Sequence, residues 1–159
     1  MTRNPDTQLP MDVLRKFRMI FGSVRQHFRE VEQSCGVSGS QLWILQEVAS
    51  MPGLGVSELA ARLAIHQSTC SQLVEKLVAR GLLLKRRSAQ DQRRVDLSLS
   101  AEAEGILGRA AGPAAGLLPV ALMALSADTL AVLNDSLARV IEHLPSRDER
   151  WADRPLADL

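Results

Sequence analysis

The chain has 159 residues, of which 46% are apolar, and a formal net charge of +1. These values indicate one globular domain, or a small domain with an accessory helical region, and exclude a disordered chain. No apolar run approaches the roughly 18 residues that cross a bilayer, the N-terminus has no apolar signal region, and two cysteines are too few for a disulfide framework. We therefore expect a soluble cytoplasmic protein.

The charges are unevenly distributed along the chain. Residues 53–99 hold eight Lys/Arg and four Asp/Glu, a net of +4, whereas residues 100–159 hold five and nine, a net of −4. A local basic surface on a near-neutral chain can bind phosphates, although ordinary scatter of surface charge is an equal alternative at this stage.

The first third of the chain predicts two helices. Apolar side chains recur at three- and four-residue spacing over residues 11–34, which indicates one long amphipathic helix. Ser38 followed by Gln41 forms a capping-box pattern for a second helix. This helix should end near Ser50, because a Pro-Gly pair follows.

Two short helices and a hairpin follow. Ser57 is expected to cap a helix over residues 58–63, and a tight turn separates this helix from another over residues 68–80. The segment 82–87 is apolar and then basic, and the segment 93–99 alternates between apolar and polar residues, so we expect two strands joined by a polar turn. This order of elements is typical of a winged helix-turn-helix.

The last third predicts two more helices and a tail. Ser100 is expected to cap a fifth helix, which Pro113 and Pro119 should kink or break. Ser126 is expected to cap a sixth helix that Pro145 stops, and the charged tail beyond it should be loosely ordered. The expected fold is therefore mainly α with a small β-hairpin.

The second helix of a helix-turn-helix enters the DNA major groove, so its exposed face should carry short hydrogen-bonding groups. The helix over residues 68–80 has such a face, and a lysine one turn further on suits a phosphate. The alternative is that Ser68 and Thr69 only cap the helix, a role that is compatible with DNA contact. The residues expected to contact DNA are Gln67, Ser68, Thr69, Ser71, Gln72 and Lys76.

Four arginines flank the tip of the expected hairpin: Arg86, Arg87, Arg93 and Arg94. Guanidinium groups on a narrow projection suit the minor groove, where A·T-rich segments concentrate negative potential. One acidic residue, Asp91, lies inside this basic turn, where we expect it to orient the arginines or brace the turn. The alternative is a solvated surface hairpin without a ligand.

Together these motifs resemble the MarR family of bacterial transcription regulators. The resemblance covers about residues 11–145 and is sharpest over residues 56–100. The matching positions are Leu59-Ala60, Ser68-Thr69, Ser71, Leu73-Val74, Leu77, Gly81-Leu82, and the pair Asp91 and Arg93. The sequence departs from the family at Cys70, where an aliphatic residue is usual, and at Gln72, where an arginine or another polar residue is common.

The resemblance implies one domain over residues 11–145. In it, residues 38–100 form the winged helix-turn-helix, residues 11–34 and 101–145 form a helical dimerisation region, and the charged tail covers residues 146–159. It also implies a homodimer that binds a palindromic operator, by default as a repressor. A small anionic aromatic effector would release this dimer from DNA. The broad apolar stripes of the outer helices agree with a dimer, because a single helix leaves such a face exposed.

The residues expected to bind the effector are Arg18, Arg25, Trp43 and His66. An arginine can hold a carboxylate bidentately, and an indole can stack on an aromatic ring. Each residue also has a plainer alternative. The arginines suit surface or interface ion pairs, the tryptophan suits core packing, and the histidine suits a turn position.

Three other functional classes compete with this interpretation. Cys35 or Cys70 could sense oxidants, but neither lies near a cluster that would stabilise a thiolate. A winged module that binds only protein would lack sequence-specific DNA affinity. We expect no enzymatic activity, no cofactor and no metal, because the sequence has no glycine-rich phosphate loop, no CxxC pair and no HExxH motif, and its three histidines are scattered.

Overall fold

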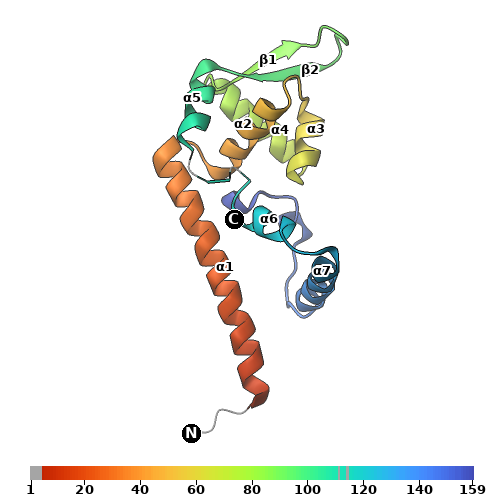
Figure 1. The fold of residues 1–159 in the computed structure, drawn as a ribbon. Coiled ribbons are helices and arrows are strands. Elements are labelled where there is room, and N and C mark those ends of the chain that lie inside the picture. The colour runs from red at the N-terminus through yellow and green to blue at the C-terminus, as the bar shows by residue number, and fades with distance from the viewer. Residues whose placement is uncertain (1–4, 111, 114) are drawn as a thin grey trace.

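Seven helices and one two-stranded antiparallel sheet make up residues 5–110, 112–113 and 115–159, the part of the chain that the computed structural model describes (Figure 1). The helices are α1 (Pro5–Cys35), α2 (Gly39–Ser50), α3 (Val56–Leu63), α4 (Gln67–Ala79), α5 (Ala101–Arg109), α6 (Leu117–Met123) and α7 (Ala127–Glu142). The strands are β1 (Leu83–Arg87) and β2 (Val95–Leu99), and two single turns of 3-10 helix, Glu149–Trp151 and Leu156–Asp158, follow α7. The expected fold class is confirmed.

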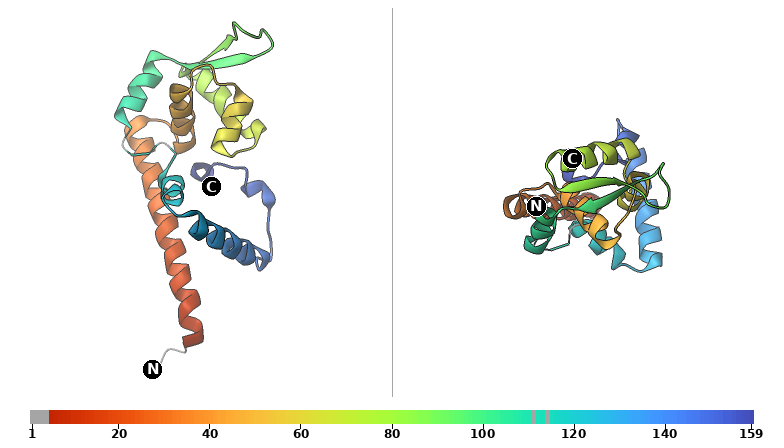
Figure 2. Two further views of the ribbon diagram at one scale, coloured as in Figure 1. Left: turned by 45° about the vertical axis from the view of Figure 1, so that its right-hand side comes forward. Right: turned by 90° about the horizontal axis from the view of Figure 1, so that it is seen from above.

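The hydrophobic core lies among α2, α3, α4, α5 and the sheet. Its fully buried side chains include Leu42, Ile44, Leu45, Leu59, Leu77 and Leu97. Full burial of one such side chain is worth roughly 1.5–3 kcal/mol, so this region is stabilised by its own residues. Helix α1 contributes Val31 and Cys35 to the core from its last turns. Its earlier turns extend away from the core, with α6 packed beside the helix (Figures 1 and 2).

The turn between α3 and α4 is tight. Ala64 ends α3 in the left-handed conformation (φ 53°), and the N–H of Ile65 donates to the carbonyl of Ala60 at 3.1 Å. His66 then caps α4, because its side chain accepts a hydrogen bond from the backbone N–H of Ser68. With an imidazole as the cap, α4 begins one residue earlier than the sequence pattern predicts.

The predicted start of α3 is wrong by two residues. The helix begins at Val56, and its N-cap is Gly55 instead of Ser57. The carboxylate of Glu58 accepts a hydrogen bond from the N–H of Gly55 at 3.1 Å. Because the third helical residue satisfies the cap amide from inside the helix, the cap position needs no polar side chain of its own.

The sheet pairs β1 with β2 in an antiparallel register that runs from Leu83 opposite Leu99 to Arg87 opposite Val95. Backbone hydrogen bonds also join Leu97 to the loop between α2 and α3. The N–H of Gly53 donates to the carbonyl of Leu97 at 3.2 Å, and the N–H of Leu97 donates to the carbonyl of Leu54 at 3.1 Å. Strand β2 is therefore paired with β1 along one edge and held to the loop before α3 along the other.

The break predicted at Pro113 is confirmed, whereas the kink or break predicted at Pro119 is wrong. α5 ends at Arg109, and Pro113 lies in the connection that leads to α6. Pro119 instead lies in the first turn of α6, where a missing backbone N–H costs nothing. Ser126 caps α7 by accepting a hydrogen bond from the N–H of Thr129, as expected.

Both ends of the chain differ from the prediction. Helix α1 begins at Pro5, before the expected start near residue 11, because a proline is tolerated at a first helical position. The tail is not loosely ordered. The N–H of His66 donates to the carbonyl of Asp153 at 3.1 Å, the hydroxyl of Ser40 donates to Asp158 at 3.0 Å, and Pro155 is buried. These contacts return the tail to the helix-turn-helix (Figure 2).

Candidate nucleic-acid interface

Helix α4 has two distinct faces. Cys70, Leu73, Val74 and Leu77 are buried and fix the helix in the core. The other face carries the polar residues expected to contact DNA. Of these, Gln67, Ser68, Gln72 and Lys76 are exposed, and Thr69 and Ser71 are half-buried. The structure thus offers a firmly seated helix with a free polar side, which is the arrangement that groove recognition requires.

Ser68 is restricted by its neighbour. The Nδ1 atom of His66 accepts a hydrogen bond from the backbone N–H of Ser68 at 3.2 Å, so Nδ1 carries no proton in this arrangement. The Ser68 hydroxyl lies 2.7 Å from the same Nδ1 and therefore donates its own proton to it. The hydroxyl oxygen of Ser68 is left as an acceptor for any third partner.

Three of the four wing arginines are free. Arg86, Arg87 and Arg93 are exposed, and in the described ranges none of their guanidinium groups makes an intramolecular hydrogen bond or ion pair. The Oδ1 atom of Asp91 accepts a hydrogen bond from the backbone N–H of Arg93 at 2.9 Å. Asp91 therefore fixes the backbone of the turn from which Arg93 projects.

Arg94 is engaged within the protein. Its Nη2 donates to Glu58 at 2.7 Å and to the carbonyl of Gly53 at 3.0 Å, and its Nε donates to Asp96 at 3.2 Å. The geometry thus separates Arg94 from the other three arginines, although all four look alike in the sequence.

Two further contacts hold α4 and were missed at the level of sequence. Lys85 of β1 forms an ion pair with Glu75 of α4. At the end of α4, Arg80 donates to the carbonyl of Gly36 at 2.9 Å and to the side-chain oxygen of Gln41 at 3.3 Å. Each pair joins separate elements, and no local motif indicates such contacts.

In the described part of the chain, none of the hollows is lined by Arg18, Arg25, Trp43 or His66, the four residues expected to bind an effector. The indole of Trp43 donates to Glu47 at 3.2 Å, and Glu47 also pairs with Arg62 at 2.5 Å. His66 caps α4, as described above. Arg18 and Arg25 are exposed on α1, and in the described part of the chain no hydrogen bond or ion pair joins them to the other two.

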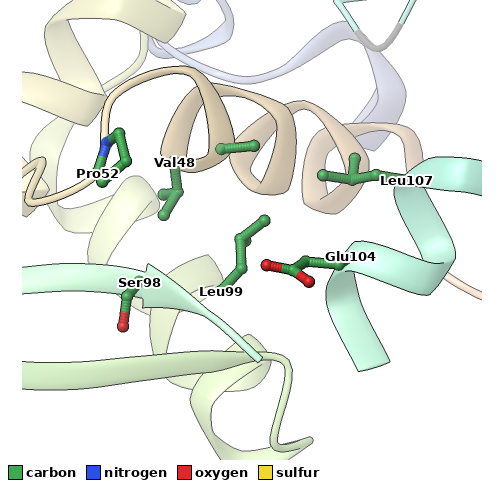
Figure 3. A pocket seen from close by; sticks show the side chains of 7 residues that line it. Val48, Pro52, Ser98, Leu99, Glu104 and Leu107 are labelled. Atoms are coloured by element: carbon green, nitrogen blue, oxygen red, sulfur yellow. The ribbon is translucent and has the colours of Figure 1, made fainter. Parts of the chain in front are cut away.

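Two hollows are candidate sites for a small ligand. An apolar groove of about 430 Å³ lies among α1, α6 and α7, with Lys16 and Ser136 as its polar lining residues, and none of the four expected effector residues lines it. A second cleft of about 440 Å³ lies among α2, β2 and α5 (Figure 3). In Figure 3 the hydroxyl of Ser98 points away from Val48, which leaves Glu104 as the one polar side chain turned toward this cleft. Neither hollow shows the convergent polar groups typical of a small-molecule site.

Both cysteines are buried. Burial raises the pKa of the Cys70 thiol to about 11, and this thiol donates a hydrogen bond to the carbonyl of Val56 at 3.7 Å. Cys35 lies 3.4 Å from the hydroxyl of Ser34. A reactive cysteine needs an exposed, stabilised thiolate, and this environment disfavours one at Cys70.

Within the residues that the structure describes, no helix combines the length and the apolar character needed to cross a membrane.

Comparison with known proteins agrees with this geometry. The model of the MarR family matches residues 36–94. The HTH-type transcriptional repressor MdtR of Bacillus subtilis (strain 168) is 27% identical over 97 residues, which are 61% of this chain and 63% of MdtR. The match therefore spans less than two thirds of that relative's own length.

Solved structures share the fold over most of the chain. The PcaV transcriptional regulator from Streptomyces coelicolor, solved in complex with its natural ligand, has a TM-score of 0.52 at 27% identity, covering 90% of this chain and 99% of PcaV. A mutant MarR from E. coli in complex with operator DNA has a TM-score of 0.55 at 18% identity, covering 82% and 96%.

The family is one of transcriptional regulators and not of enzymes, in line with the expectation from the sequence. Its match covers α2, α3, α4, β1 and the turn of the hairpin up to Arg94, and these include the elements that carry the candidate interface. On this evidence residues 36–94 of the chain are similar to the MarR family, and the fold is that of a winged helix-turn-helix protein.

Proposed function

We propose that this protein is a DNA-binding transcription regulator that acts as a homodimeric repressor. The observation that carries the proposal is the polar face of α4 standing free beside three unpaired wing arginines. Two relatives support it, because MdtR is described as a transcriptional repressor and the mutant MarR was solved on operator DNA. A regulator of this kind works on chromosomal DNA, so we also propose a cytoplasmic location.

We assign the DNA contacts by chemistry. Gln67 and Gln72 can each pair with an adenine edge in the major groove, and Ser68, Thr69 and Ser71 can reach bases or phosphates. Lys76 is placed one turn further along α4 for a phosphate. Arg86, Arg87 and Arg93 are proposed to enter the minor groove or contact its backbone, with Asp91 bracing the turn that presents them.

The outer helices supply the proposed dimer interface. Large apolar side chains stand exposed on all three of them, for example Met19 on α1 (72% exposed), Met123 on α6 (73%) and Val132 on α7 (68%). Such a surface is larger than a stable monomer ordinarily leaves open, and a second copy would cover it. A twofold dimer would place its two α4 helices on a palindromic operator with half-sites about 34–36 Å apart, or a multiple of this distance.

We further propose that a small ligand, such as an anionic aromatic compound, releases the dimer from DNA by favouring a different spacing of the two α4 helices. The support is that PcaV was solved with its natural ligand. Since Arg18, Arg25, Trp43 and His66 line none of the hollows of the described protomer, the ligand would contact only some of them or would bind where two protomers meet.

The proposal is tested by fluorescence anisotropy with DNA from the region upstream of the protein's own gene and with a scrambled fragment of equal length. We expect the upstream fragment to bind more tightly, and small aromatic acids to weaken that binding. Equal affinity for both fragments at low salt would instead support the protein-binding module.

The wing assignment has its own test. Replacing Arg93 with alanine should weaken binding and lower the slope of log affinity against log salt by about 1, because one phosphate contact is lost. Glu102→Ala on α5, an exposed residue outside the interface, is the matched control. An Arg93→Ala protein that binds as tightly as the parent would contradict the role given to the wing.

A further inference from the structure

The wing stands away from the start of α3 and is bridged to it at one place. A cleft of about 380 Å³ separates the two elements and is lined by Ser57 and Glu58 from α3 and by Arg93, Arg94 and Val95 from the wing. The guanidinium of Arg94 spans this cleft through its 2.7 Å contact with Glu58. This bridge adds to the backbone bonds of Leu97 and to the packing of its side chain in the core, which also hold β2 to the α3 side.

The bridge continues into the turn that presents Arg93. The backbone N–H of Arg94 donates to the carbonyl of Asp91 at 2.9 Å, and its carbonyl accepts from the N–H of Ser88 at 2.9 Å. Arg94 is therefore the residue at which the turn closes and at which the wing meets the helical domain. A shift of its side chain would be passed directly to the neighbouring Arg93.

The charges around Arg94 disfavour a direct contact with DNA. Its side chain faces two carboxylates, Glu58 and Asp96, at 2.7 and 3.2 Å. These two negative charges exceed the single positive charge between them, so the cluster as a whole repels a phosphate. Both Arg94 and Glu58 are about half exposed, and an ion pair of this kind adds little to overall stability. Its contribution is to the position of the wing.

Resting on the DNA-binding function proposed above, we propose that Arg94 is a positioning residue. Through Glu58 and the carbonyl of Gly53 it anchors the wing to the start of α3, and it thereby aims Arg93 at DNA without touching DNA itself.

The substitution that separates the two roles is Glu58→Gln. If Arg94 were a DNA contact held back by Glu58, removing this negative charge would strengthen DNA binding. If Arg94 is an anchor, the same substitution loosens the wing and weakens binding despite the more favourable charge. Glutamine retains a side-chain oxygen that can accept from the N–H of Gly55, so the cap of α3 is preserved.

We expect Arg94→Ala to weaken binding by about 5- to 20-fold and Glu58→Gln to weaken it by less, because the amide oxygen can still accept a hydrogen bond from Arg94 but carries no charge. The double variant should bind no more weakly than Arg94→Ala alone, because both substitutions act on the same bridge. The salt dependence of affinity should stay as in the parent for both variants, in contrast to Arg93→Ala. Glu102→Gln, which removes a charge from α5, serves as the matched control and should leave affinity unchanged.

Hydrogen exchange of the free protein provides a second readout that needs no DNA. The amides of Ser88 and Arg94 should exchange faster in Arg94→Ala and in Glu58→Gln than in the parent. Tighter binding by Glu58→Gln, or a salt slope lowered by about 1 in Arg94→Ala, would show that Arg94 contacts DNA and would overturn the proposal. Unchanged exchange in both variants would overturn it as well. Failure of the parent to bind DNA would count against the proposed function alone, and the exchange data would still decide on the anchor.

Discussion

The winged helix-turn-helix and the outer helices carry similar local sequence signals for helix formation, but only the winged helix-turn-helix buries most of its apolar side chains. In α2, α3 and α4 the apolar faces are buried against one another and against β2. Helix α7 is also amphipathic, and Ser126 caps it as regularly as Ser38 caps α2, yet neither α7 nor the wholly apolar α6 contains a buried residue. Amphipathic patterning therefore predicts a helix but leaves open whether its apolar face packs within the same chain or against a second molecule.

The difference also divides the work between the two regions. The winged helix-turn-helix, which buries its apolar faces within the protomer, carries the polar face of α4 and the wing arginines. The region that leaves Met123 and Val132 exposed is proposed to join two copies. Reading DNA and pairing protomers are then separate tasks, so variants should affect one without the other.

The largest expected effect is on the free energy of unfolding, through a substitution in the core of the winged helix-turn-helix. Leu45 is fully buried, so Leu45→Ala should lower the free energy of unfolding by about 2–5 kcal/mol, through lost burial and a residual cavity. Leu144, beyond the end of α7, is half exposed in the protomer, and Leu144→Ala should cost less than about 1 kcal/mol at concentrations where the protein is monomeric. Urea titrations of the two variants measure the difference. Equal losses would remove the contrast between the two regions.

The next effect concerns the exposed surface. Met123→Glu places an unpaired charge in the proposed dimer interface and should weaken self-association by roughly 100-fold, since a buried charge without a partner costs several kcal/mol. Met51→Glu is the matched control, because Met51 is an exposed methionine at the end of α2. Analytical ultracentrifugation distinguishes them. A Met123→Glu protein that remains dimeric would place the interface elsewhere.

Much of the fold could be predicted from the sequence because its signals are local. The Ser38 and Gln41 capping box, the change to alternating residues near Val95, and the break near Pro113 each act within a few residues. The prediction of the α3 start was wrong because a helix can be capped in more than one way. Gly55 caps α3 while the carboxylate of Glu58, inside the helix, accepts a hydrogen bond from the Gly55 N–H. A pattern that requires a polar residue at the cap position does not indicate such a start.

Long-range contacts account for the rest. Ser40 and Asp158 are 118 residues apart in sequence, and nothing in either segment indicates that they meet. In the candidate interface the sequence shows where positive charge gathers, but it leaves open what each charge faces. Arg93 and Arg94 are neighbours with the same side chain, and only the fold shows that Arg94 is already engaged by Glu58.

A smaller effect tests the turn at the centre of the helix-turn-helix. Ala64 adopts a left-handed conformation (φ 53°), which costs a residue with a side chain about 1 kcal/mol more than glycine. Ala64→Gly should therefore raise the free energy of unfolding by up to about 1 kcal/mol, offset in part by the greater freedom of glycine in the unfolded chain. Thermal unfolding checks the sign. A clear loss of stability would mean that the methyl group is needed for packing.

The smallest effect at neutral pH concerns Cys70. Its pKa is raised from 9.0 to about 11 by burial, so the folded state retains a proton that the unfolded state loses. The resulting stability is fully present below pH 9 and is lost as the pH rises toward 11. Unfolding of the parent should therefore become easier over that interval, and Cys70→Ala should lack this dependence. Rapid alkylation of native Cys70 at pH 8 would contradict its buried environment and revive the redox alternative.

Hydroxyl-radical footprinting on the bound upstream fragment tests most directly whether the winged helix-turn-helix contacts DNA while the outer helices form the dimer, because it reports on DNA contact and on dimer symmetry together. The account predicts two protected half-sites related by twofold symmetry, with centres a whole number of helical turns apart, about 10 base pairs for each turn. Met123→Glu should reduce occupancy of both half-sites together, whereas Arg93→Ala should reduce protection in the minor groove beside each one. A single half-site, or protection without symmetry, would contradict it.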